Sequence, residues 1–174
     1  MKEINKEKPV WIELGLQTIH ESTAELIRRG YELPCFIDAV RRLKEAGLTV
    51  IVHVILGLPG ETEDMMLETI RFLANHTPPV DGIKLQLLHV LKGTKLAALY
   101  EAAMTMEEYI DLILKCIRLL PPHIVIHRLS GDGPKKLLIA PEWSGNKRLF
   151  LNSLTRALRE TGAYQGEWHR PRQP

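Results

Sequence analysis

The chain has 174 residues, of which 45% are hydrophobic and 25% charged, and its net charge is +2. These values are ordinary for a globular domain that can bury a core, and the small net charge alone predicts no polyanionic partner. The apolar runs are too short to span a membrane, and the polar, lysine-rich start predicts neither a signal peptide nor an anchor. We therefore expect a polar leader (1–9), one domain (10–162) and a disordered tail (163–174).

The cysteine content points to a reducing compartment. The only two cysteines, Cys35 and Cys116, are too few for a disulfide framework. Both lie within apolar helical patterns, so we expect both to be buried. The sequence therefore predicts a cytoplasmic protein without structural disulfides.

Apolar stretches alternate with amphipathic ones along the chain. The apolar stretches predict strands over 10–17, 50–56, 82–90 and 123–129. The amphipathic stretches predict helices over 22–30, 34–47, 62–77, 94–102, 105–120 and 146–161, and the Gly- and Pro-rich stretch 130–143 predicts a loop. This alternation is typical of an α/β protein with parallel strands and right-handed crossovers.

Three helix starts carry capping signals. Ser22 with Glu25, and Thr105 with Glu108, have the spacing of a capping box. Thr62 precedes two acidic residues, which favour the first turn of a helix. We expect a side-chain cap at each of these positions.

The most informative stretch is VIVHVILGLPGE at residues 50–61. Its β-branched run, bounded by Gly and Pro, predicts a strand buried on both faces, as in parallel sheets. In such sheets, ligands bind at the carboxyl ends of the strands. We therefore expect the functional site at this glycine loop. The small number of strands leaves an apolar edge unpaired, so the chain is interpreted as part of a barrel.

Three local patterns, in order, carry a resemblance. They are ELGLQ at 13–17, RRGY at 28–31 and VILGLPGE at 54–61, with RLSGDGPKKLLIAPEWS at 128–144 as a fourth. Together they resemble the radical S-adenosylmethionine (radical SAM) superfamily, in the YhcC/YtqA-type branch that is similar to the radical enzyme subunit of Elongator. The resemblance implies the carboxyl-terminal part of a partial (β/α)6 TIM-like barrel.

The resemblance also defines what this chain lacks. In the family, three cysteines of a CxxxCxxC loop hold a [4Fe-4S] cluster that cleaves S-adenosylmethionine to a 5′-deoxyadenosyl radical. Here the two cysteines lie far apart and no such motif exists. We therefore expect no metal ligands in this chain and no radical chemistry from the chain alone. His123 and His127 have an i, i+4 spacing, but no third ligand stands nearby, so zinc is not predicted.

The resemblance assigns S-adenosylmethionine contacts to four residues. Gln17 matches a position that hydrogen-bonds the amino-acid end, and Arg29 matches the arginine that pairs with the carboxylate, with Arg28 as its neighbour. A loop-capping glutamine and a helix C-terminal cation are the structural alternatives. Ile55 and Gly57 match the adenine-contacting pattern, for which barrel packing is the alternative.

Five further residues extend this predicted site. His53 stands where related enzymes often place an aspartate that binds the ribose, and His89 lies in a segment that runs along adenine. Glu13, Lys84 and Gln86 are expected to face the barrel lumen and a substrate, with a Glu13–Lys84 ion pair as the alternative.

Two functions follow from these observations. The first is the carboxyl-terminal portion of a radical SAM enzyme, which supplies cofactor and substrate contacts, with a tRNA base as the substrate. The excess of basic residues over 123–159 and a stacking face on Trp143 are compatible with RNA. The sequence alone favours a solvated helix face with ordinary lysines, and the Elongator resemblance adds support for RNA. The second is a non-catalytic assembly module that binds no S-adenosylmethionine and pairs with a separate amino-terminal half or with itself.

Overall fold

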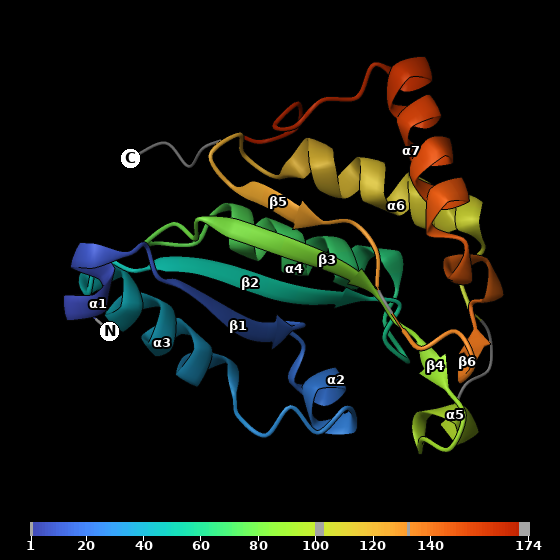
Figure 1. The fold of residues 1–174 in the computed structure, drawn as a ribbon, viewed down its shortest axis with the longest axis horizontal. Helices are drawn as coiled ribbons and strands as arrows, with labels where there is room; N and C mark the ends of the chain where they lie inside the picture. Colours follow the sequence, from blue (N-terminus) through green and yellow to red (C-terminus); the bar gives the residue numbers. More distant parts are fainter. Residues whose placement is uncertain (1, 100–102, 132, 171–174) are drawn as a thin grey trace.

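A four-stranded parallel sheet forms the centre of the protein. The computed structural model describes residues 2–99, 103–131 and 133–170 (Figure 1). The strands lie in the order β1, β2, β3 and β5, and they span Trp11–Gln17, Thr49–Leu56, Gly82–Leu87 and Val125–Arg128. A separate antiparallel pair joins β4 (Val90–Leu91) to β6 (Leu138–Ala140). The predicted α/β fold with parallel strands is thus confirmed.

Three long helices cover one face of this sheet. They are α3 (Leu33–Glu45), α4 (Glu63–Ala74) and α6 (Met106–Leu119), which lie behind the strands in Figure 1. The remaining helical segments are α1 (Lys2–Glu7), α2 (Glu21–Leu26), α5 (Leu96–Leu99), the 3-10 helix η1 (Glu142–Gly145) and α7 (Lys147–Thr161). Across the described ranges, no helix combines the length and apolarity needed to cross a bilayer.

The central strand β2 explains why the sheet is stable. Its alternate residues, from Val50 to Leu56, join the core beneath the helices, and Ile51 on the opposite face is also buried. Strands of a sheet alternate their side chains between faces, so a strand that is apolar on both must be central. The stretch is a central strand as predicted, but His53 and Ile55 on the face opposite the helices are partly exposed, so the strand is not buried on both faces along its whole length.

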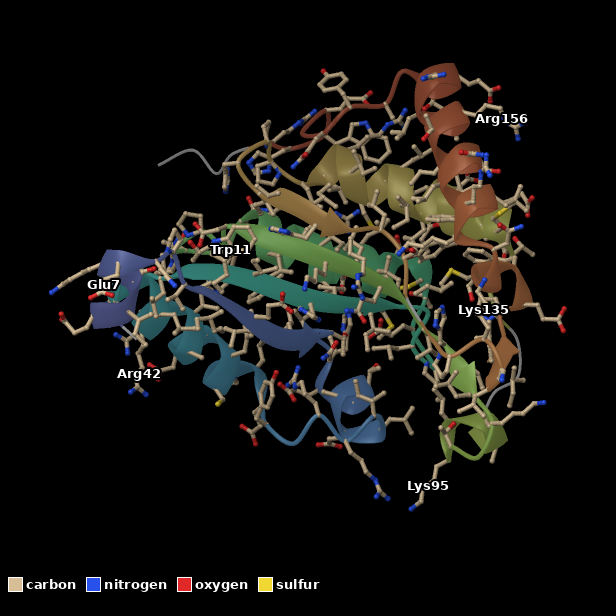
Figure 2. All side chains as sticks on the ribbon, in the orientation of Figure 1. Glu7, Trp11, Arg42, Lys95, Lys135 and Arg156 are labelled. Atoms are coloured by element: carbon tan, nitrogen blue, oxygen red, sulfur yellow. The ribbon has the colours of Figure 1, made fainter. Side chains whose placement is uncertain are left out.

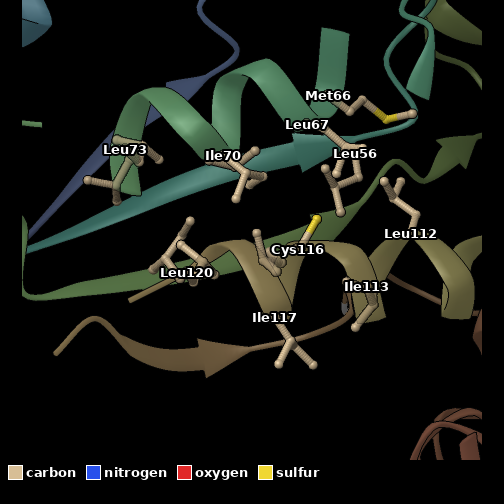
Figure 3. Close-up of a cluster of buried hydrophobic side chains, with 14 of the residues drawn as sticks. Leu56, Met66, Leu67, Ile70, Leu73, Leu112, Ile113, Cys116, Ile117 and Leu120 are labelled. Carbon is tan, nitrogen blue, oxygen red and sulfur yellow. The ribbon is translucent and has the colours of Figure 1, made fainter. Parts of the chain in front are cut away.

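The main core lies between the sheet and the helix pair α4 and α6 (Figure 3). Ile70 and Leu73 of α4 and Ile113 and Cys116 of α6 expose 1% of their surface or less. Their spacing of three residues places each pair on one helix face, as helical periodicity requires. Burial raises the pKa of the Cys116 thiol to about 12 and keeps it protonated and inert. Cys35, in contrast, is exposed, so the prediction that it is buried is wrong.

Two of the three predicted caps are present. The Thr62 hydroxyl accepts a bond from the Met65 amide at 3.3 Å, and Thr105 with Glu108 forms a complete capping box. The capping box predicted at Ser22 is wrong, because α2 begins at Glu21 after His20 and has no side-chain cap. The His20 ring is instead hydrogen-bonded to the Met65 carbonyl at 2.9 Å, a tertiary contact that local sequence does not reveal.

The segment after β3 differs from the predicted single strand over 82–90. β3 ends at Leu87, and the chain then turns away to form β4. The predicted loop over 130–143 supplies its partner, β6. A two-residue and a three-residue strand carry too little periodicity to be recognised separately.

Both ends of the described chain have more structure than the expected leader and tail. The Asn5 side chain of α1 donates to the Gly47 carbonyl at 3.1 Å. Residues 163–170 lie against α6, where the Trp168 amide donates to the Arg118 carbonyl at 2.8 Å and its ring stacks on the guanidinium. Gln165 donates to the carbonyl of Pro121. Polar bonds of this kind order a segment that its composition assigns to a tail, while 171–174 lie outside the described residues.

We predict that Ile70→Ala lowers the free energy of unfolding by about 2–5 kcal/mol, because it removes methyl groups from a site without solvent access. The same truncation at Leu151 of α7, which is 40% exposed, is expected to change stability by less than about 0.5 kcal/mol. Urea denaturation of both variants measures the difference. Equal losses would contradict this placement of the core.

Candidate functional site

Two adjoining cavities open at the carboxyl ends of β1, β2 and β3. The first has a volume of about 760 Å³ and the second about 600 Å³, which is the size range of small-molecule sites. Figure 2 labels Trp11 near the amino end of the sheet and Lys95 on the cavity side. The residues that line both cavities are mostly apolar: Leu26, Leu58, Pro59, Leu88 and Leu96.

The end of β1 forms one wall of the first cavity. The pairing with β2 shifts between Gly15 and Gln17, and Gln17 takes a left-handed backbone conformation with φ 65°. Its carboxamide folds back so that a Cβ on Gly15 would lie 2.6 Å from the amide nitrogen. A side chain at position 15 would displace the end of Gln17 from this place. The Tyr31 hydroxyl donates to the Gly15 carbonyl and joins the RRGY segment to the ELGLQ segment.

Arg29 is the best-anchored side chain of this cavity. Its Nε donates to the Tyr31 carbonyl at 2.8 Å. Its Nη1 donates to the carbonyls of Thr18 at 2.7 Å and Leu16 at 3.3 Å. Its Nη2 donates to the two Glu21 oxygens at 3.1 and 3.2 Å. A guanidinium has five N–H donors, so every donor of Arg29 has a partner.

Two other cations line the first cavity. Arg28, with φ 57°, and Lys95 are both exposed, and they come from segments far apart in the sequence. The two neighbouring arginines therefore differ in environment: Arg29 is tied to the fold, whereas Arg28 remains at the surface.

The second cavity contains the glycine loop that follows β2. Gly57 has φ 85°, and a Cβ there would lie 2.7 Å from the terminal carbon of Met104. Its amide donates to the Met66 sulfur at 3.1 Å. Glu61 at the same loop accepts a hydrogen bond from the buried Thr18 hydroxyl at 2.5 Å, and burial raises the pKa of this carboxyl. The loop thus offers mostly apolar surface with one half-buried carboxyl group.

A row of polar side chains follows the face of the sheet opposite the helices. Glu13 of β1 binds Lys84 of β3 and accepts from His53 Nε2 of β2 at 2.7 Å. The Gln86 amide donates to His53 Nδ1 at 3.0 Å, which places the ring proton on Nε2. Hydrogen bonds from Lys84 first, and His53 second, lower the pKa of the Glu13 carboxyl. These four side chains form one network rather than a set of free ligands.

His89 occupies a cradle made by two glycines. A Cβ on Gly133 would lie 2.6 Å from its Nδ1, and one on Gly131 would lie 2.9 Å from its Cε1. Glycine at these two positions therefore makes room for the imidazole ring. Neither cavity includes His89 among its lining residues.

The structure thus divides the predicted site residues among several places. Gln17, Arg29 and Ile55 line the first cavity, and Gly57 lines the second. The remaining predicted residues lie elsewhere, in the polar row and the glycine cradle: Glu13, His53, Lys84, Gln86 and His89. The expectation of a Glu13–Lys84 pair is met.

Sequence reasoning missed several parts of the site. Gly15 and Tyr31 lie within the ELGLQ and RRGY segments, but the hydrogen bond between them forms only in the folded chain. Glu21 gave no signal, since a glutamate at a helix start is common. Trp143 is partly buried: its ring packs against Tyr109 and Phe150, with centroids 5.6 and 5.7 Å apart, and its Nε1 donates to the Met104 carbonyl.

The chain does not fit a [4Fe-4S] cluster. Its two cysteines lie on α3 and α6, and Cys116 is fully buried. Among the described residues, no three His, Cys, Asp or Glu side chains are close enough to hold a metal ion.

Two family models match successive parts of the sequence. The model of the radical SAM superfamily matches residues 1–73, and that of the Radical_SAM C-terminal domain matches residues 80–160. The chain is 40% identical over 172 residues to the uncharacterized protein YtqA of Bacillus subtilis, covering 97% of this chain. The chain belongs to the radical SAM superfamily. Proteins of this superfamily use S-adenosylmethionine and a [4Fe-4S] cluster.

Two further relatives match most of the chain. Protein YhcC of Escherichia coli is 36% identical over 166 residues, covering 93% of this chain. Elongator complex protein 3 of Schizosaccharomyces pombe is 28% identical, covering 82% of this chain and 27% of that protein. The chain spans about half the length of YtqA and YhcC, 53% of each.

A solved structure shares the fold. Archaeal Methanocaldococcus infernus Elp3 superimposes with a TM-score of 0.78, at 21% identity, over 94% of this chain and 39% of that chain. This structure therefore shares the arrangement of parallel strands and covering helices, as expected for part of a TIM-like barrel.

We predict that Lys84→Met raises the pKa of Glu13 toward its ordinary value of 4.5, since the ammonium is the first cause of the lowered value. Because the folded-state pKa is lowered, the ionised carboxyl stabilises the fold above the unfolded-state pKa. That contribution is lost as the pH falls through the folded value. Carboxyl ¹³C NMR titration measures the shift.

Lys44→Met is the matched control, because Lys44 pairs with Asp81 instead of Glu13. An unchanged Glu13 titration in Lys84→Met would contradict the network.

Proposed function

We propose that this chain serves as the carboxyl-terminal portion of a radical SAM enzyme, to which it supplies S-adenosylmethionine and substrate contacts. The observation that carries the proposal is the first cavity, where Gln17, Arg29 and Ile55 meet at the carboxyl ends of the parallel strands. A cluster, which this chain does not ligate, would be held by cysteines outside it.

The donor set of the cavity suits S-adenosylmethionine. The Gln17 carboxamide can donate to a carboxylate and accept from an ammonium group, and the side chain of Ile55 offers an apolar surface to adenine. Gly57 allows the close approach of backbone in the adjoining cavity. When bound with the cluster, this cofactor supplies a 5′-deoxyadenosyl radical. The residues of this chain would bind it, orient it and exclude water.

The polar row on the open face of the sheet is suited to contact a substrate. Glu13, Lys84 and Gln86 lie on the face without helices, where a barrel lumen would be. Their charges and amide groups can hold a polar substrate against the cofactor. His53 is engaged at both ring nitrogens, so its role under this proposal is to position Glu13 rather than to bind ribose.

A tRNA base is the substrate that we propose. The support is an exposed set of cations on the carboxyl-terminal segment: Lys135, Lys136, Lys147, Arg148, Arg156 and Arg159. Cationic side chains bind phosphate backbones, and this binding weakens as salt is added. The proposal does not rely on Trp143, whose partly buried ring packs against Tyr109 and Phe150.

The free sheet edges favour the second candidate, an assembly module. β1 and β5 are the edge strands of the sheet, and Trp11 and Val125 on them are 59% and 56% exposed. Exposed strand edges pair readily with other chains, whether a separate amino-terminal half or a second copy.

The proposed cofactor site predicts saturable binding of S-adenosylmethionine in calorimetric titration. Arg29→Ala is expected to weaken this binding roughly 10- to 100-fold, because hydrogen bonds to charged groups contribute about 1.5–3 kcal/mol. Arg42→Ala, on the exposed surface of α3, is the control and should leave the affinity unchanged. Wild-type protein that binds no S-adenosylmethionine would contradict the proposal.

The assembly candidate predicts a self-associated species in size-exclusion chromatography with light scattering. Trp11→Lys is expected to convert it to a monomer, since a charge at an edge opposes strand pairing. A wild-type chain that elutes as a monomer at every concentration would exclude self-association and leave only a separate partner.

A further inference from the structure

The ion pair between Arg29 and Glu21 joins a buried cation to a half-exposed anion. The Arg29 side chain is 2% exposed, whereas that of Glu21 is 45% exposed. The other partners of this guanidinium are the backbone carbonyls of Tyr31, Leu16 and Thr18, which leave only if the backbone itself moves. Glu21 is therefore the one partner that a rotation of its side chain can remove.

The position of Glu21 permits such a rotation. It is the first residue of α2, a helix of six residues without a side-chain cap. Besides Arg29 it holds the Leu33 amide, which donates to its Oε1 at 2.6 Å. Release of Glu21 therefore breaks its bonds to Arg29 Nη2 and to the Leu33 amide, and no bond between backbone groups.

Only one member of this ion pair lines the first cavity. Arg29 lines the first cavity, whereas Glu21 is not among its lining residues. A carboxylate that enters the cavity therefore meets a guanidinium whose charge is already paired and whose donors are all in use. It can accept hydrogen bonds from Nη2 only if it replaces the two Glu21 oxygens there.

We propose that Glu21 is an internal carboxylate competitor, which occupies Arg29 until the carboxylate of a ligand takes its place. This inference rests on the proposed function, which gives the ligand its carboxylate. The exchange keeps the buried cation paired at every stage, and an unpaired buried charge is strongly unfavourable. The half-exposed Glu21 side chain moves into water, where its charge is solvated.

The competitor lowers the affinity for carboxylate ligands alone. Because Glu21 is half-exposed and is solvated when released, we expect it to weaken binding roughly fivefold, which corresponds to about 1 kcal/mol. A ligand without a carboxylate does not displace Glu21, and its affinity is independent of this residue. Glu21 thus sets how strongly the site favours carboxylate over non-carboxylate ligands.

The test is calorimetric titration of Glu21→Gln with S-adenosylmethionine and with decarboxylated S-adenosylmethionine. Glutamine retains an acceptor for the Leu33 amide but removes the charge, so the first ligand should bind roughly fivefold tighter and the second unchanged. Glu25→Gln, at an exposed position of the same helix, is the matched control and should alter neither affinity. Equal weakening of both ligands by Glu21→Gln would show a purely structural pair and overturn the inference.

A second measurement separates this inference from the proposed function. Sodium acetate is titrated into both proteins while the Arg29 Nε–H resonance, assigned through its loss in Arg29→Lys, is followed by ¹⁵N NMR. Acetate should shift this resonance at lower concentration in Glu21→Gln than in wild type. If no variant binds S-adenosylmethionine, the proposed function fails, while the acetate response still decides whether Glu21 competes. Identical acetate responses overturn it.

Discussion

The structure depends on one constraint, the burial of β2 between β1 and β3. The residues of β2 that face the helices are fully buried, and the strand lies at the centre of the sheet between two parallel neighbours. Because the strands are parallel, the loops after them meet at one edge. Gln17 at the end of β1 and Gly57 at the end of β2 therefore lie in adjoining cavities, although forty residues separate them. The site is a consequence of strand direction.

Charged side chains gather at two places, the end of β1 and the open face of the sheet, and their hydrogen bonding differs between the two. At the end of β1, one arginine is surrounded by backbone carbonyls and a single carboxylate, so its donors are saturated. On the open face of the sheet, Glu13 is shared between Lys84 and His53, and each retains some exposure. The hydrogen bonds of Arg29 hold the backbone at the end of β1 in place beside the first cavity. The network around Glu13 leaves a polar surface that a substrate can contact.

The sequence predicted those features whose physics is local or periodic. The buried run of β2, the caps at Thr62 and Thr105, and the glycine loop all depend on neighbouring residues. The features that it missed depend on distant contacts. The α2 start is tied to Met65, and Trp143 is held by the Met104 carbonyl. In the same way, the family patterns located Arg29, but only the fold reveals that Glu21 already neutralises it.

The contact between Trp143 and Met104 gives the protein an optical reporter. The indole N–H donates to the Met104 carbonyl at 2.9 Å, and the side chain of the same methionine covers Gly57 in the second cavity. A ligand in this cavity that shifts the Met104 backbone changes the hydrogen bond of the indole. The fluorescence emission of Trp143 therefore registers occupancy of a pocket that the ring itself never touches.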